Sequence, residues 1–297
     1  MLPGLCAFPL TPLSHDEVDE AAYAGLVERL AAAGVDSITA LGSTGSYAYL
    51  SAEERRRVAR LALRHAGDVP VIVGVGALRT SHVLDLARDA EQLGAAGLLV
   101  APVSYQPLTD DDVFGLYEDL SAAVPLPLVV YDNPGTTHFT FSDALHARIA
   151  RLPTVASIKI PAVPREPEAA RARIDALRAV VPERVTIGIS GDAAAATGLT
   201  AGCDAWYSVI GGTIPGPALT ITRAARSGDA ATAFAESRRL QPLWDLFVEH
   251  GSLRVVAAIA ELAGLVQPDC LPRPLRGLDG PGRRRVAEVA RALGLTP

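Results

Sequence analysis

Residues 154–159 read Thr-Val-Ala-Ser-Ile-Lys, a short run of small and β-branched side chains that ends on Lys159. A run of this kind predicts a buried strand. Similar runs recur along the chain, and Ala-, Leu- and Arg-rich segments with helical spacing separate them. This alternation predicts repeated strand–helix units and a parallel sheet.

The repeats predict eight strands, and hence an α/β protein with a (β/α)8 TIM barrel. The expected strands are 4–8, 35–41, 70–75, 97–101, 127–131, 154–159, 185–189 and 204–209. The expected helices are 18–33, 51–65, 80–93, 110–122, 142–151, 167–180, 192–200 and 214–226. Ser51, followed three residues later by Glu54, predicts a capping box at the start of the second helix.

The alternation stops after about residue 227, and the remainder predicts a three-helix extension. Its helices are expected near 228–249, 251–263 and 281–294, with a Pro-rich stretch at 266–274. We therefore predict two domains, a barrel over 1–226 and a C-terminal helical extension over 227–297. Because no flexible linker separates them, the extension is expected to pack on the barrel.

Lys159 is the only lysine among 27 basic residues, which leaves 26 arginines by subtraction. A guanidinium stays protonated, whereas a desolvated ε-amine can lose its proton and add to a carbonyl. Codon bias that removed lysine elsewhere is an alternative explanation. The position of Lys159 at the end of a buried strand, where barrels place functional groups, favours a catalytic amine.

Composition also argues against several kinds of binding partner for this chain. The net charge is −6 without a basic stripe, which argues against nucleic acid, and no apolar run reaches the roughly 18 residues of a membrane span. No secretory signal is visible, so a cytoplasmic location is expected. The cysteines Cys6, Cys203 and Cys270 are widely spaced and expected to be free, and the scattered histidines predict no metal site.

Two further groups are predicted at the same face as Lys159. Tyr131 ends the strand before the lysine strand, so its phenol could reach the amine, although a core tyrosine would show the same pattern. Residues 42–45, Gly-Ser-Thr-Gly, could present backbone N–H groups to an anion or form only a tight turn. Together these are the parts that a class I aldolase or dehydratase needs to hold a 2-oxo acid and attack its ketone.

Four segments resemble the dihydrodipicolinate synthase/N-acetylneuraminate lyase family, in order and spacing, over essentially the whole chain. They are residues 4–12, 42–45, 131–134 and 157–159. The resemblance implies a (β/α)8 barrel with a three-helix C-terminal segment, usually a homotetramer. It also implies that pyruvate or a related 2-oxo acid binds as a covalent imine on Lys159, without another cofactor.

The resemblance also implies roles for individual residues. Tyr131 is the expected proton-relay phenol, and Ser43 and Thr44 are expected to grip the substrate carboxylate, with Thr44 counted among the catalytic residues. Residues 190–192, Ser-Gly-Asp, match a family segment near the site. The other expected substrate-binding residues are Gly45, Thr136, Ser190 and Tyr207.

Three positions depart from the synthases of this family. Ser46 stands where they carry a glutamate, and Ser104 stands where they carry a tyrosine from a neighbouring subunit, with Tyr105 one residue later. Thr136 stands where an arginine meets the carboxylate of the aldehyde, a strong charge-assisted contact. The departures disfavour synthase activity. Thr136 and His138 would suit a polyhydroxylated sugar-acid tail, unless His138 is a solvent-exposed loop residue.

The leading hypothesis is a Schiff-base-forming lyase that acts on pyruvate or a 2-keto-3-deoxy sugar acid through Lys159. One alternative is 4-hydroxy-tetrahydrodipicolinate synthase, which condenses pyruvate with aspartate semialdehyde. Others are a non-catalytic 2-oxo acid binding protein and a barrel that binds phosphate at Gly211 and Gly212, which would leave the lone lysine unexplained. The expected partners are a small-molecule 2-oxo acid and further copies of the chain, as a homotetramer or homodimer.

Overall fold

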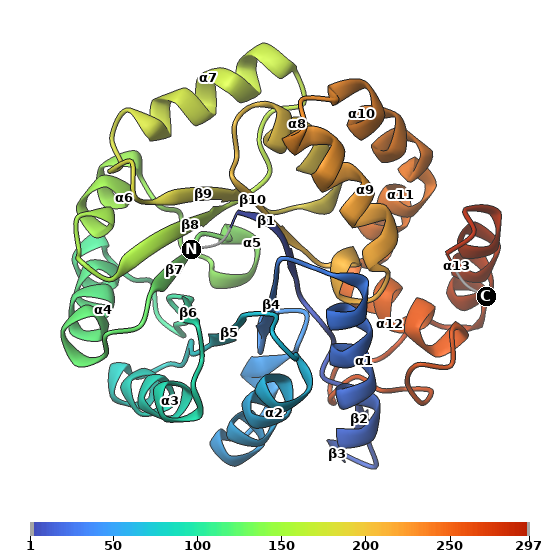
Figure 1. The fold of residues 1–297 in the computed structure, drawn as a ribbon. Helices are drawn as coiled ribbons and strands as arrows, with labels where there is room; N and C mark the ends of the chain where they lie inside the picture. Colours follow the sequence, from blue (N-terminus) through green and yellow to red (C-terminus); the bar gives the residue numbers. More distant parts are fainter. Residues whose placement is uncertain (1–2, 296–297) are drawn as a thin grey trace.

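The computed structural model describes residues 3–295, and in it eight parallel strands close into one barrel (Figure 1). Each predicted strand is confirmed to within two residues at either end, and the (β/α)8 class is confirmed with them. Around the barrel, each strand pairs with the next along the chain, and the last pairs with the first. The strands are β1 Gly4–Ala7, β4 Ser37–Ala40, β5 Val71–Gly74, β6 Gly97–Val100, β7 Leu128–Tyr131, β8 Val155–Ile160, β9 Thr186–Ile189 and β10 Ala205–Ser208.

Helices surround the barrel as a ring (Figure 1). The Ser51 capping box is confirmed: Ser51 Oγ accepts from Glu54 N at 3.3 Å, and Ser51 N donates to Glu54 Oε2 at 2.7 Å. The segment predicted as one helix over 192–200 is a 3-10 turn, η2 Asp192–Ala194, followed by α8 Ala195–Thr200. The other ring helices are α1 Glu20–Ala33, α2 Ala52–His65, α3 Thr80–Leu93, α4 Asp110–Ala123, α6 Asp143–Ala150, α7 Pro167–Arg178 and α9 Pro215–Arg226.

Strand β8 shows how alternation along a strand divides its side chains between two cores. Ile158 and Ile160 join the large apolar cluster between the barrel and its helices. Lys159 points the other way, toward Phe8 and Tyr131 of a separate cluster in the barrel interior. Because successive side chains of a strand face opposite sides, two buried isoleucines fix the lysine inside the barrel.

After α9 the chain forms four helices, so the prediction of a three-helix extension is wrong. They are α10 Ala230–Arg239, α11 Gln241–His250, α12 Ser252–Leu262 and α13 Gly280–Ala292. The predicted helix 228–249 breaks at Leu240 because Pro242 lacks an N–H and its ring would clash with the Arg238 carbonyl inside a continuous helix. Pro242 is instead accommodated in the first turn of α11.

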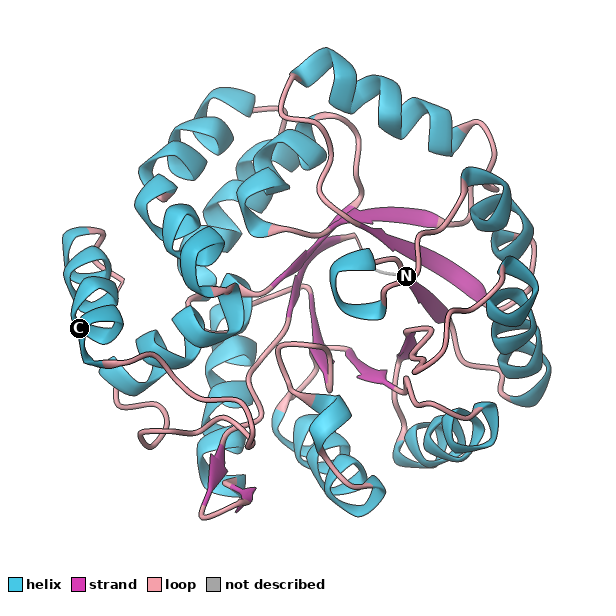
Figure 2. Cartoon of the chain, turned by 180° about the vertical axis from the view of Figure 1, so that it is seen from behind, coloured by secondary structure: helices cyan, strands magenta, loops and turns pink. Residues whose placement is uncertain are grey.

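The C-terminal helices lie on one side of the ring in both views (Figures 1 and 2). Val256 and Ala260 of α12 share a buried cluster with Leu10 and Leu26 of the barrel part. The division into two domains stays a prediction, and residues 1, 2, 296 and 297 of the predicted spans lie outside the described residues. None of the helices between residues 3 and 295 combines the length and the apolarity that a bilayer span requires.

Two small elements were not predicted from the sequence. A hairpin, β2 Leu13–Ser14 and β3 Glu17–Val18, lies outside the barrel beside α1 (Figure 1). The short helix α5 Pro134–Thr137 follows β7 and lies over the barrel opening (Figure 2). It ends at His138, whose backbone has a left-handed φ of 56°. This turn brings Thr136 back toward the end of β7.

Candidate active site

The amine of Lys159 is surrounded by aromatic rings. Only 4% of the residue is exposed, and Nζ lies 4.1 Å from the ring centre of Phe8, 4.5 Å from that of Tyr131 and 5.8 Å from that of Tyr207. Burial lowers the pKa of Lys159, and the nearby Tyr131, Cys6 and Asp192 offset only part of this effect. No carboxylate in residues 3–295 forms an ion pair with it. The site therefore favours the neutral, nucleophilic amine.

Tyr131 pairs in register with Lys159 across β7 and β8. Its hydroxyl donates to Ser43 Oγ at 3.2 Å, accepts from Asn133 Nδ2 at 3.0 Å and lies 3.4 Å from Thr136 Oγ1. Burial alone would raise the pKa of Tyr131, but the charge of Lys159, when its amine is protonated, and these three hydrogen-bond partners lower the pKa below its ordinary value. Such a phenol is placed to pass protons to and from an atom bound at the amine.

The Gly-Ser-Thr-Gly segment forms a tight loop after β4. A Cβ on Gly42 would lie 2.4 Å from a ring carbon of Phe8, so a larger residue there would displace that ring. Within the described chain, the N–H groups of Ser43, Thr44 and Gly45 have no hydrogen-bond acceptor. Free N–H groups in such a turn suit a carboxylate.

Tyr207 of β10 is a third aromatic residue of the barrel interior beside Lys159. Its hydroxyl lies 2.7 Å from Ser157 Oγ, and burial raises the pKa of Tyr207, so it stays a neutral phenol. Gly188 of β9 pairs with Lys159, and a Cβ there would lie 2.3 Å from the Tyr207 ring. The close contact requires glycine at position 188.

Asp192 and Ser190 lie beside the amine but are held by their own partners. The Asp192 carboxylate accepts from Trp206 Nε1 at 3.0 Å, Val209 N at 3.1 Å and Ile210 N at 2.7 Å. Burial raises the pKa of Asp192, although these donors and Lys159 oppose the effect. Ser190 Oγ donates to the Ile160 carbonyl at 2.8 Å. Both residues therefore shape the site more than they offer free hydrogen-bonding groups.

A cavity of about 430 Å³ opens above Lys159. Among the predicted residues, it is lined by Lys159, Ser43, Thr136, Ser190 and Tyr207. Thr44 does not line it: this residue is 3% exposed and borders a neighbouring cavity of about 410 Å³, which shares Ser43 and Thr136. Gly45 lines neither cavity. The structure thus brings most of the predicted site together, but Thr44, Gly45 and Tyr131 do not line the cavity above Lys159.

The sequence pattern of the dihydrodipicolinate synthetase family matches residues 1–293. This chain belongs to that family. A 4-hydroxy-tetrahydrodipicolinate synthase of Methylococcus capsulatus is 32% identical over 298 residues, which cover 99% of this chain and 100% of the relative. One of Phenylobacterium zucineum is 34% identical over 247 residues, 81% of this chain and 80% of the relative.

Solved structures of the dihydrodipicolinate synthetase family superimpose closely. Dihydrodipicolinate synthase of Agrobacterium tumefaciens has a TM-score of 0.94 and 43% identity, with 98% of each chain covered. The Acinetobacter baumannii enzyme complexed with pyruvate has a TM-score of 0.91 and 26% identity, covering 99% of this chain and 100% of that one. The predicted family and enzyme class are confirmed: this chain is a lyase of the dihydrodipicolinate synthetase family.

Several residues at the site of this family member were not predicted. Asn133, which donates to the Tyr131 hydroxyl, lies inside the recognised Tyr-Asp-Asn-Pro segment, but its role was not assigned. Arg165, in the loop after β8, and Trp244, Phe247 and Val248 of α11 also line the cavity. Position 244 is 85 residues from Lys159, and no local pattern signals such a contact.

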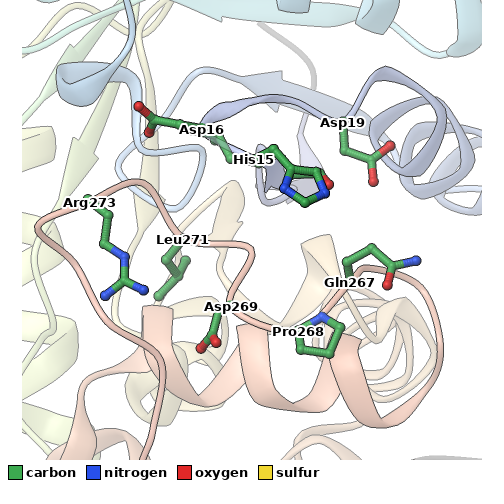
Figure 3. Close-up of a pocket in the computed structure, with 10 residues that line it drawn as sticks. His15, Asp16, Asp19, Gln267, Pro268, Asp269, Leu271 and Arg273 are labelled. Carbon is green, nitrogen blue, oxygen red and sulfur yellow. The ribbon is translucent and has the colours of Figure 1, made fainter.

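A larger cavity of about 810 Å³ lies away from the lysine (Figure 3). There His15, Asp16 and Asp19 face the loop 267–273 across a gap. Asp19 caps α1 by accepting from Ala22 N, and Asp269 accepts from Arg283 at 2.9 Å. No group of His, Cys, Asp and Glu side chains in the described part of the chain could hold a metal ion. This cavity contains no reactive amine.

Proposed function

We propose that Lys159 forms an imine with the 2-oxo group of pyruvate or a closely related 2-oxo acid, and that the protein is a class I aldolase or dehydratase. The observation that carries this proposal is the pairing of a buried amine, with a lowered pKa, with the Tyr131 phenol. The free N–H groups of residues 43–45 supply a place for the 2-oxo acid's carboxylate. No cofactor is needed, because the protonated imine itself withdraws electrons.

The chemistry follows from these positions. The Lys159 nitrogen attacks C2 of the 2-oxo acid, Tyr131 delivers a proton to the oxygen, and loss of water leaves the imine. The Tyr131 phenolate left by this step takes a proton from C3, which gives an enamine and restores the phenol. The enamine C3 forms a bond to an aldehyde carbon while the C=O π bond breaks, and the new alkoxide takes a proton from Tyr131. Water then hydrolyses the protonated imine, which frees the amine and returns a proton to Tyr131; cleavage is the reverse sequence.

Borohydride trapping tests the proposal. The protein is incubated with pyruvate and sodium borohydride, and the peptide that contains Lys159 is analysed by mass spectrometry. A stable adduct on Lys159 is expected, and none in Lys159→Arg, which keeps the charge without the nucleophile. Folded wild-type protein that remains unmodified would contradict the proposal. Pyruvate binding that survives in Lys159→Ala, without turnover of any 2-oxo acid, would instead support a non-catalytic binding protein.

A second candidate is 4-hydroxy-tetrahydrodipicolinate synthase, the activity named for the relatives. Thr136 argues against it, because it stands where the resemblance implies an arginine for the carboxylate of the aldehyde. The test supplies pyruvate with aspartate semialdehyde and measures product formation. Efficient condensation would establish this activity. Trapping of pyruvate without condensation would remove it.

We also propose that the chain assembles as a homotetramer or homodimer in the cytoplasm. Tyr49, Leu78 and Tyr105 are exposed by 48%, 66% and 90%, and they lie in the segments that follow three neighbouring strands, β4, β5 and β6. Exposed apolar side chains in adjacent segments support a contact between subunits. The free thiols Cys6, Cys203 and Cys270 fit a reducing compartment. Light scattering of wild type and Leu78→Asp tests assembly, and cell fractionation tests location.

A further inference from the structure

The outer wall of the lysine cavity is apolar. Ala162 and Val163 of the loop after β8 form one part of it, and Trp244, Phe247 and Val248 of α11 form another. The indole N–H of Trp244 donates to the Ser237 carbonyl at 3.0 Å, so that it is not available to a ligand. A substrate that extends outward from Lys159 therefore meets mostly carbon atoms.

Most polar groups near this wall already have partners inside the protein. Asn133 Nδ2 donates to Tyr131, Ser190 Oγ donates to Ile160, and the Asp192 carboxylate accepts three N–H groups. On the lining, the hydroxyls of Thr197 and Ser252 and the side-chain oxygen of Asn133 have no hydrogen-bond partner within residues 3–295. A substrate tail with several hydroxyls would leave some of its hydroxyls without a hydrogen-bond partner. Each unpaired hydroxyl would lower the affinity of the substrate about tenfold.

Arg165 adds a positive charge at the rim. It lines the cavity and is exposed, and within residues 3–295 it has no hydrogen-bond or ion-pair partner. The other cation on the lining is Lys159, which is consumed by imine formation. The one acid on the lining, Asp192, is held by its three donors. The rim is therefore suited to an anion.

We propose that the aldehyde partner of pyruvate has an apolar body and a carboxylate at its far end, which Arg165 binds. This inference rests on the proposed function. The apolar body lies against Val163 and Phe247, while the aldehyde carbon faces the enamine formed on Lys159. The bond made is the one from enamine C3 to the aldehyde carbon, with Tyr131 giving the proton to its oxygen. The product is a 4-hydroxy-2-oxo acid.

The test compares 4-carboxybenzaldehyde, benzaldehyde and D-glyceraldehyde as partners of pyruvate, with product measured by chromatography and mass spectrometry. The expected order of kcat/KM is 4-carboxybenzaldehyde, benzaldehyde, then glyceraldehyde. Arg165→Gln should lower kcat/KM about fivefold for the carboxylated aldehyde, mainly through KM, and leave benzaldehyde unchanged. Arg64→Gln is the matched control, because Arg64 is also exposed and lies on α2 outside the cavity.

Pyruvate trapping on Lys159 is measured in the same preparations. If trapping fails, the proposed function itself is wrong. If trapping succeeds but glyceraldehyde is the best partner, or neither aromatic aldehyde reacts, the inference alone is overturned. It is also overturned if Arg165→Gln lowers turnover of both aromatic aldehydes equally or changes neither.

Discussion

At the scale of single residues, the burial of the Lys159 amine is expected to lower the stability of the fold. Burial disfavours the protonated amine of Lys159, although the rings of Phe8 and Tyr131 offset part of the cost. Lys159→Met keeps the shape and removes the charge. We expect its free energy of unfolding at pH 7 to exceed that of wild type by about 1 kcal/mol.

The stability difference should depend on pH in a defined direction. The pKa of Lys159 is lowered in the folded state, so between that value and 10.5 the unfolded chain binds more protons than the folded one. Wild-type stability therefore rises with pH in this window, and the advantage of Lys159→Met shrinks. Urea unfolding at pH 7 and pH 9.5 measures both values. If the difference in free energy of unfolding between Lys159→Met and wild type were the same at both pH values, burial would not disfavour the protonated amine.

A buried pair behind Tyr131 gives a second prediction. His146 Nε2 lies 3.3 Å from Asp132 Oδ2, both side chains are buried, and the His146 ring stacks on Phe141. His146→Leu would leave the Asp132 carboxylate without its partner and should lower the free energy of unfolding by about 3 kcal/mol. Adding Asp132→Asn should recover much of the loss in a double-mutant cycle. Additive losses would mean that the two groups do not interact.

Sequence reasoning selected Lys159 and Tyr131 because their residue types are rare at the ends of buried strands. A lone lysine and a tyrosine, each ending a buried strand, predicted the amine and its phenol. It missed the Asp132–His146 pair and the α11 wall, because those contacts join residues that no local period relates. Thr44 was predicted to act with Lys159 from a motif, and a motif does not show which side chain faces the cavity.

At the scale of elements, the apolar runs predicted every barrel strand because each is buried on both sides. Short elements escaped prediction. Helix α5 has four residues, too few for a helical period, and only Pro134 at its start marks it. The break between α10 and α11 could have been predicted from Pro242, but the apolar pattern continues through it.

Packing between strands gives a prediction at Gly188 of β9. Gly188→Ala would place a Cβ against the Tyr207 ring, displace it and weaken its contact with Ser157. We expect a loss of about 2 kcal/mol in the free energy of unfolding and slower pyruvate trapping. Gly115→Ala is the control: it lies in α4 with open space around it and should stabilise by up to about 1 kcal/mol. Equal effects at the two sites would contradict the close contact at Gly188.

At the scale of the whole molecule, the extension shares a buried cluster with the barrel through Val256, Ala260, Leu10 and Leu26. We therefore expect barrel and extension to unfold in one transition. Trp206 lies in β10 and Trp244 in α11, and they are the only tryptophans of the chain. In Trp206→Phe and Trp244→Phe, fluorescence of the remaining indole should follow the same urea curve as circular dichroism. Two separate curves would indicate domains that fold independently.

The ring-lined surroundings of Lys159 also make its nitrogen a single spectroscopic probe. Protein grown with 15N-labelled lysine would carry the isotope at one side chain, so each chemical form of that atom gives its own magnetic resonance signal. The rings of Phe8, Tyr131 and Tyr207 would shift the signals of the adjacent methylene protons away from those of a solvated lysine. Amine and iminium could then be counted during turnover, without attaching any reporter group.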